Sequence, residues 1–183
     1  VTIKTHKEAG KVVPRPIHAS AGHPFVPLMK WLCVKIEAGI TDSQHLLRDS
    51  SDLVRRLRNV KVPTGYRFVK LDIKDFYMAG SIPNLVRCSV DLVDGDVREL
   101  VRSGLELVLY HQYVQNPMNG NVYRVTKGSG MGLQASATVS DAAFYVQVER
   151  DFILTDEVRR RYKVLEYFRF RDDILIICGG DSR

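Results

Sequence analysis

Two adjacent acids, Asp172 and Asp173, follow Arg171 and separate two mainly apolar strands near the end of this 183-residue chain. The whole stretch runs from Tyr162 to Cys178, and its two halves have the composition of buried β-strands. Neighbouring carboxylates repel each other, and burying them between apolar strands is costly unless a cation lies beside them. The pattern therefore predicts a tight hairpin with both acids at its tip, beside positive charge.

A third acid, Asp72, falls at the end of another apolar strand, expected over residues 66–73. An acid at such a position needs a partner, because a structural strand favours a hydrophobic residue there. Alone, Asp72 is more simply explained as a turn residue, and Asp172-Asp173 as a solvated turn. If the two strands are neighbours in one sheet, Asp72 and Asp172 converge on the same edge and can bind two hard cations through oxygen ligands. The matching apolar flanks favour this metal site.

The remaining pattern predicts a mixture of helices and short strands, and hence an α+β fold. A hairpin is expected over residues 112–125, with its turn at Asn119-Gly120. A long helix is expected to follow the glycine loop Gly128–Gly132 and to continue through Phe152. Other helices are expected over residues 24–37, 42–58 and 96–111, and two extended segments over residues 1–20.

Positive charge is concentrated at the start of the chain. The sequence has 27 Lys and Arg against 21 Asp and Glu, a net charge of +6. Residues 1–70 carry 13 basic and 5 acidic side chains, whereas residues 71–183 carry 14 and 16. A basic first part beside a mildly acidic remainder suits a protein that binds phosphates with one part and cations with the other. A solubilising surface is the alternative, and charge alone slightly favours it.

The cysteines and histidines do not form a zinc-binding pattern. Cys33, Cys88 and Cys178 are odd in number and far apart, which predicts reduced thiols in an intracellular protein. The sequence begins without the apolar run of a signal peptide and contains no stretch long enough to span a membrane. Because Val1 is not a natural start, we expect the chain to be a fragment.

The acidic segments resemble motifs of the reverse transcriptase family, and they occur in the family's order. Asp72, with Tyr77 five residues later, resembles the first metal-binding motif. The resemblance implies that the aromatic ring stacks under the incoming sugar and excludes a ribose 2′-hydroxyl, which favours DNA synthesis. The segment Phe170-Arg171-Asp172-Asp173 resembles the family's aromatic-x-Asp-Asp turn, with Phe in place of the usual Tyr.

A glycine-rich segment lies between the two acidic motifs, over residues 128–136. It resembles the motif that opens the helix beneath the template, in a form closest to that of Penelope-like retroelements. Glycines allow the backbone to approach a base pair closely. The residues expected to contact template and primer are Gly128, Gly130, Met131 and Gly132. The family's Gln a few residues earlier is replaced here, at Val125.

The N-terminal segment contains Lys4 and, after a turn, Arg15-Pro16-Ile17. It resembles the fingers motif whose Lys and Arg hold the triphosphate. Arg binds phosphate bidentately and Lys as a point charge. Without the other motifs, a solvated basic hairpin would be the better explanation.

The resemblance covers nearly the whole chain and implies a right-hand polymerase palm: an antiparallel sheet backed by helices, with a partial fingers subdomain. The fingers are expected over residues 1–62 and an incomplete palm over residues 63–183. The family's motifs that follow the Asp-Asp hairpin, including the lysine-bearing motif, the primer grip and the thumb, are absent. We therefore expect the isolated chain to be inactive or nearly so as a polymerase.

The implied reaction is RNA-directed DNA synthesis, in which a primer 3′-hydroxyl attacks a deoxynucleoside triphosphate. The resemblance assigns both metal ions, Mg²⁺ or alternatively Mn²⁺, to Asp72 and Asp172, with Asp173 and the carbonyl of Ile73 assisting. The implied partners are an RNA template, a DNA primer and the dNTP. An intracellular location follows, in the nucleus of a eukaryote.

Two other functions compete with polymerisation. The first is a catalytically inactive, nucleic-acid-binding remnant of a retroelement, and the three intact acids argue against such decay. The second is a metal-dependent nuclease, which would not explain Tyr77 or the basic pair Lys4 and Arg15. Metal titration separates the remnant from the enzyme, and product analysis separates the nuclease from the polymerase.

Overall fold

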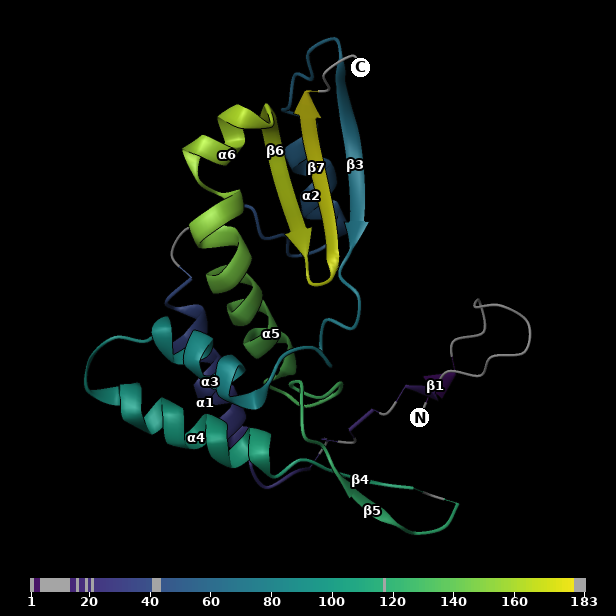
Figure 1. Cartoon of the computed structure of the whole chain (residues 1–183), viewed down its shortest axis with the longest axis vertical. Coiled ribbons are helices and arrows are strands. Elements are labelled where there is room, and N and C mark those ends of the chain that lie inside the picture. Colours follow the sequence, from purple (N-terminus) through teal and green to yellow (C-terminus); the bar gives the residue numbers. More distant parts are fainter. Residues whose placement is uncertain are drawn as a thin grey trace. The chain divides into compact units, whose positions relative to one another are not determined.

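The structure is a computed structural model that describes residues 2–3, 14–15, 17–18, 20, 22–40, 44–116 and 118–179, with backbone alone for 2–3 and 14–15 (Figure 1). Its residues form two compact units, each built from two stretches of chain. The first unit comprises Val1–Gly39 and Tyr77–Ala143, and the second Ile40–Phe76 and Phe144–Arg183. The predicted division into fingers and palm near residue 62 is a functional one, and it stays a prediction.

The first unit is mainly helical. Its α1 buries Met29, Leu32 and Ile36 at the three- and four-residue spacing of one helix face. A Cβ added to Gly104 of α4 would lie 3.1 Å from the Leu32 side chain, so this glycine lets α1 and α4 pack closely. The helices are α1 (Val26–Glu37), α3 (Ile82–Asp91), η1 (Gly95–Val97), α4 (Arg98–Tyr110) and, at the end of the unit, α5 (Ser136–Phe144).

Two short antiparallel hairpins also belong to the first unit. The predicted turn at Asn119-Gly120 is confirmed: Gly120 has φ 72°, and its amide donates to the carbonyl of Asn116 at 2.8 Å. The N-terminal strands pair as the two extended segments expected there. The strands are β1 (Thr2–Ile3) with β2 (Pro14–Arg15), and β4 (Tyr113–Gln115) with β5 (Val122–Arg124).

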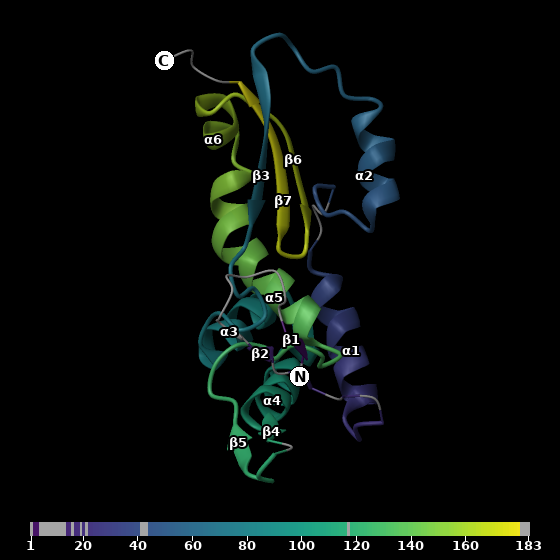
Figure 2. The ribbon, with the colours of Figure 1, turned by 90° about the vertical axis from the view of Figure 1, so that its right-hand side faces the viewer.

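The second unit contains an antiparallel sheet with strand order β3-β7-β6. Figure 2 shows this sheet between α2 on one side and the helix that carries η2 on the other. A cavity of about 250 Å³ lies between α2 and the sheet, and its lining includes Leu53 of α2 and Phe168 and Leu175 of the sheet. The elements are α2 (Ser50–Leu57), β3 (Tyr66–Asp72), η2 (Tyr145–Ile153), α6 (Asp156–Arg161), β6 (Val164–Phe170) and β7 (Asp173–Gly179).

The outer edge of β6 is covered by the segment before α2. The Leu47 amide donates to the Arg169 carbonyl at 2.8 Å, and the Arg169 amide donates to the His45 carbonyl at 3.0 Å. The prediction of a helix over 42–58 is therefore wrong for the described residues before Ser50. The physical reason is that the backbone around Leu46 pairs with β6 and so cannot form helical hydrogen bonds, and the Asp49 carboxylate then starts the helix by accepting the Asp52 amide at 2.8 Å.

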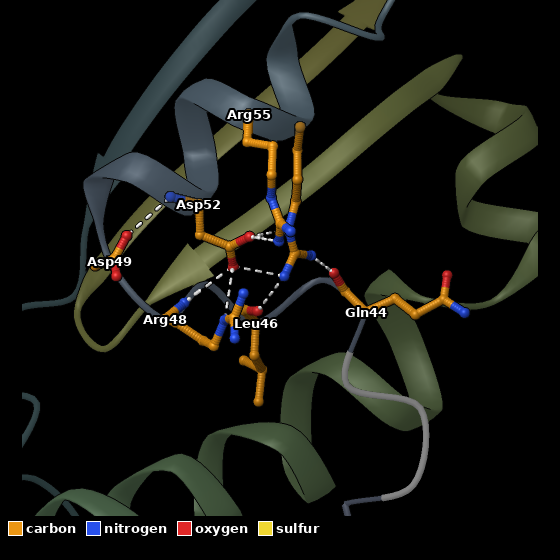
Figure 3. Close-up of polar contacts among 7 residues, drawn as sticks. Gln44, Leu46, Arg48, Asp49, Asp52 and Arg55 are labelled. Atoms are coloured by element: carbon orange, nitrogen blue, oxygen red, sulfur yellow. Dashed lines mark hydrogen bonds and ion pairs between the residues drawn. The ribbon is translucent and has the colours of Figure 1, made fainter.

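Asp52 links the start of α2 to that extended segment (Figure 3). Its buried carboxylate accepts from Arg55 Nη2 at 2.5 Å, from Arg56 Nη2 at 2.7 Å and from the Arg48 amide at 3.2 Å. Hydrogen bonds from Arg56 and Arg55 lower the pKa of Asp52. Arg56 also donates to the carbonyls of Gln44 and Leu46, so one acid–base cluster fixes the whole segment.

The predicted long helix is confirmed as α5 followed without interruption by η2. In η2 the hydrogen bonds widen to π spacing, as when the Leu154 amide donates to the Glu149 carbonyl five residues earlier, at 2.9 Å. Such turns are rare in helices and are frequent at functional sites. Of the helices that the structure describes, none combines the length and the apolar character needed to cross a bilayer.

Candidate active site

The acid hairpin has the form expected for it. Strands β6 and β7 are joined by Arg171 and Asp172, and Phe170 pairs with Asp173. Arg171 has φ 55°, as the first central residue of a two-residue turn of the II′ kind requires. A side chain other than glycine is strained in that conformation, and such strain clusters at functional sites.

Asp72 lies directly opposite Asp173 in the pairing of β3 with β7. Directly opposite residues point to the same face of a sheet, with Cβ atoms about 4.5–5.5 Å apart. The amide of Ile73 donates to the carbonyl of Asp172 at 2.8 Å. The structure therefore brings all three predicted acids to one end of the sheet, with Asp173 facing Asp72 and Asp172 in the turn beside them.

A lysine side chain contacts one of the acids at this end of the sheet. Lys70 lies two residues before Asp72, on the same face of β3, and its Nζ is 3.1 Å from Asp173 Oδ1. Both side chains are more than half exposed, so the pair contributes little to stability, about 0–1 kcal/mol. Lys70 thus supplies the positive partner expected for the acids, and the weak pair leaves the carboxylate open to exchange with a metal ion.

The acids fit Mg²⁺ by the chemistry of their oxygen donors, which are the ligands that hard divalent cations prefer. Asp72 and Asp173 share a face, and Asp172 is half-buried in the adjacent turn. Within the described ranges, no three His, Cys, Asp or Glu side chains already converge on a common point for an ion. Ligation by all three would require their side chains to turn toward the ion.

The glycine motif belongs to the first unit and is fixed to Tyr77 there. The amides of Ser129 and Gly130 donate to the Tyr77 carbonyl at 2.8 and 3.3 Å, and the Gly128 amide donates to Gly80 at 3.0 Å. A Cβ on Gly128 would lie 2.6 Å from the Met78 Cα, so only glycine fits this close approach.

The start of α5 braces the same loop from beneath. Ser129 Oγ lies 2.9 Å from Ser140 Oγ, and Ser136 Oγ donates to the carbonyl of Ser129 at 3.0 Å and to that of Gly130. All three serines are buried. Hydrogen bonds to the segment from Tyr77 to Gly80 on one side and to α5 on the other therefore hold this loop in place.

The segment that follows Arg15 packs on the glycine motif. The His18 amide donates to the Met131 carbonyl at 2.7 Å, and Ser20 Oγ donates to the Gly132 carbonyl at 2.6 Å. Burial lowers the pKa of His18. His18 and Ser20 are thus held against the glycine motif. Lys4 lies outside the described residues, and the side chain of Arg15 does too.

Two further charged residues, Arg169 and Glu149, have fully buried side chains in the second unit and belong to none of the sequence motifs. Arg169 stands in the apolar strand β6, and Glu149 follows Val146 by three residues, on the helix face that carries apolar residues. A charged residue at each of two apolar positions is a signal of a buried pair, because neither charge is stable alone in a core.

Comparison with known proteins gives matches to solved structures only. No family model matches the sequence, and no curated protein matches it. The apo telomerase of Candida tropicalis is similar with a TM-score of 0.59 and 14% identity over 84% of this chain and 31% of the telomerase. The chain has a telomerase-like fold. Two further matches are telomerases in complex with a TWJ fragment of telomeric RNA. That of Candida tropicalis has a TM-score of 0.60 and 12% identity, over 89% of this chain and 30% of the telomerase. That of Candida albicans has a TM-score of 0.59 and 15% identity, over 84% of this chain and 30% of the telomerase.

The telomerase-like fold confirms the predicted fold class, an α+β palm-like arrangement of antiparallel sheet and helices. The chain spans about a third of the length of each of these telomerases. At 12–15% identity the likeness concerns the fold, a reverse-transcriptase fold.

Proposed function

We propose that this chain forms the fingers and palm of an RNA-directed DNA polymerase. The observation that carries the proposal is the pairing of Asp72 with Asp173, with Asp172 in the adjoining turn, at one end of the sheet of a telomerase-like fold. A fold alone does not establish an activity, but three hard-oxygen donors at this place give the fold a specific chemistry. The Penelope-like form of the glycine motif points to a retroelement source.

In the proposed reaction the 3′-oxygen of a DNA primer attacks the α-phosphorus of a dNTP, and the bond to the departing pyrophosphate breaks. Asp72, Asp172 and Asp173 would hold two Mg²⁺ ions. When bound, the ions lower the pKa of the attacking hydroxyl and stabilise charge on the leaving pyrophosphate. The polymerase copies an RNA template, which the glycine motif contacts.

Three other residues have roles in nucleotide binding. Lys4 and Arg15 neutralise the triphosphate, since a lysine provides a point charge and an arginine a bidentate contact. Tyr77 selects the sugar, and its main chain is already anchored by the glycine motif. The basic first part of the chain contributes attraction to template and primer phosphates.

Metal binding provides the first test. Mn²⁺ titration of the chain, followed by electron paramagnetic resonance, should give saturable binding that Asp72→Asn weakens about tenfold or more, the effect of losing roughly 1.4 kcal/mol. Asp151→Asn is the matched control, because Asp151 is an exposed acid of the same unit that pairs only with its neighbour Arg150 among the contacts described. Equal Mn²⁺ affinity in Asp72→Asn and the wild type would exclude the assigned site.

The competing functions predict different results with nucleic acid. A primed RNA template and dNTPs are incubated with the chain and Mg²⁺ or Mn²⁺, and the primer length is measured. Extension by even a few nucleotides, abolished in Asp172→Asn, supports the polymerase. Shortened primer or template indicates a nuclease, and RNA binding without any Mn²⁺ binding indicates an inactive remnant.

A further inference from the structure

A buried ion pair lies beneath the acid turn of the second unit. Arg169 Nε is 2.6 Å from Glu149 Oε1, and Arg169 Nη2 is 2.8 Å from Glu149 Oε2, a bidentate arrangement. Tyr167 also donates its hydroxyl to Glu149 Oε1 at 2.8 Å. Both charged side chains are fully buried. Apolar residues of similar volume often stabilise a core as well as a buried ion pair does. The role of this ion pair is therefore indicated by the other groups that it contacts.

The third nitrogen of the guanidinium reaches the acid turn. Arg169 Nη1 donates to the carbonyl of Arg171 at 3.2 Å. That carbonyl belongs to the peptide that joins Arg171 to Asp172, and Arg171 has the strained φ of 55°. The hydrogen bond therefore fixes the peptide immediately before the first acid of the hairpin.

The face of the same guanidinium contacts the chain that follows Asp72. The Arg169 Cζ lies 5.1 Å from the ring centre of Phe144 and 6.0 Å from that of Phe76, and the two rings are 6.4 Å apart. Phe76 is buried and comes four residues after Asp72. One side chain thus contacts both segments that carry the acids, within a single compact unit.

Glu149 is itself oriented from several directions. It projects from the π-helical segment η2, and His45 Nε2 lies 3.1 Å from its Oε2. Burial raises the pKa of Glu149, but the nearby His45 ring and the hydrogen bonds from Arg169 outweigh burial and lower it to about 2. Glu149 is therefore ionised at neutral pH and provides a fixed negative partner for Arg169.

We propose that Arg169, oriented by Glu149, is a positioning residue that holds the Asp172–Asp173 turn in register with the segment after Asp72. The consequence for metal binding rests on the proposed function. The consequence for the turn does not, because the exchange of its backbone amides with solvent can be measured without any metal.

The test uses the double variant Arg169→Met/Glu149→Gln. It removes both buried charges at nearly constant volume, which buried pairs often tolerate, and Gln still accepts from Tyr167. We expect the variant to fold with an unfolding midpoint near that of the wild type, to exchange the amides of residues 171–174 faster, and to bind Mn²⁺ about tenfold or more weakly. Arg159→Met is the matched control, because Arg159 also donates to a strand carbonyl, that of Leu165, away from the turn.

The outcomes separate the two proposals. Wild-type amide exchange at the turn in the double variant would overturn the positioning role, whatever the metal affinity. A second outcome is that the wild type binds no Mn²⁺ while the double variant exchanges the turn amides faster than the wild type. That result would keep the positioning role and overturn the proposed function. If the double variant does not fold, Arg169→Lys decides, because Lys can pair with Glu149 as a point charge but lacks the fork that also reaches Arg171. Unchanged exchange and Mn²⁺ affinity in Arg169→Lys would overturn the positioning role.

Discussion

The Tyr77 carbonyl accepts the amide of Ser129 at 2.8 Å, across 51 intervening residues. The residue predicted to select the sugar is thereby fixed to the motif predicted to contact the template, within one compact unit. Neither motif alone indicates this link, because it is made by main-chain atoms that every residue type carries. The two predicted roles therefore depend on the same glycine loop.

The close approach at Gly128 predicts a large cost for a methyl group. In Gly128→Ala the new Cβ would meet main-chain atoms of Tyr77 and Met78 at 2.6–2.8 Å, and main chain cannot move aside as a flexible side chain does. Gly120→Ala is the matched control, since Gly120 has a similar φ of 72° but open space around it. We expect Gly120→Ala to cost about 1–2 kcal/mol of unfolding free energy in urea, and Gly128→Ala clearly more. Equal losses of unfolding free energy in the two variants would show that the positive φ, and not the close contact, sets the cost.

The sequence predicts the acid end of the sheet well, for a physical reason. Asp72 ends one apolar strand and Asp172-Asp173 stand between two others, so antiparallel pairing of these strands brings the acids to one sheet end, and they meet there as expected. Burial is not the reason for β3, because this edge strand is mostly exposed. The sequence does not predict which acid faces Asp72. Asp172 and Asp173 are neighbours of opposite orientation, and the length of the turn decides that Asp173 is the one opposite Asp72.

Long-range pairing explains what could not be predicted. Residues 44–49 have a helical apolar pattern, but main-chain hydrogen bonds with Arg169, in a strand more than 100 residues later, keep them out of a helix. The helices α3 and α6 were not expected either. Arg169 can be buried because it pairs with Glu149, which lies 20 residues earlier on a helix. Only the packing of that helix on the sheet brings the two side chains together, so the sequence does not predict the pair.

The Asp52 cluster predicts a stability effect that is separate from the active site. Asp52→Asn should lower the thermal unfolding midpoint, because the neutral amide loses its ion pairs with Arg55 and Arg56 and presents N–H groups to other donors. Asp151→Asn, which removes a surface pair with Arg150, should change the midpoint little. A loss of similar size in both variants would contradict a special role for Asp52.

The low pKa of Glu149 predicts a loss of stability in acid. Its pKa is about 2 in the folded chain against 4.5 for an ordinary Glu, so ionised Glu149 stabilises the fold above about pH 4.5. That contribution, roughly 3 kcal/mol, is lost progressively as the pH falls toward 2. Urea unfolding at a series of pH values should therefore show a steeper decline for the wild type than for Arg169→Met/Glu149→Gln, which lacks the titrating group. Parallel declines would contradict the assignment.

Sugar selection by Tyr77 is the sharpest prediction for the proposed polymerase. The ring of Tyr77 comes five residues after Asp72, the proposed metal ligand, and so leaves the strand close to where the sugar of the nucleotide is proposed to lie. The measurement is the ratio of dissociation constants for ATP and dATP, each titrated in the presence of Mn²⁺. Tyr77→Ala should reduce the preference for dATP about tenfold or more, in the range that a steric contact in a pocket provides. Tyr77→Phe is the matched control and should keep the preference, because the ring and not the hydroxyl is the barrier. An unchanged ratio in Tyr77→Ala would refute the gate, and a ratio lost equally in Tyr77→Phe would transfer the selection from the ring to the hydroxyl.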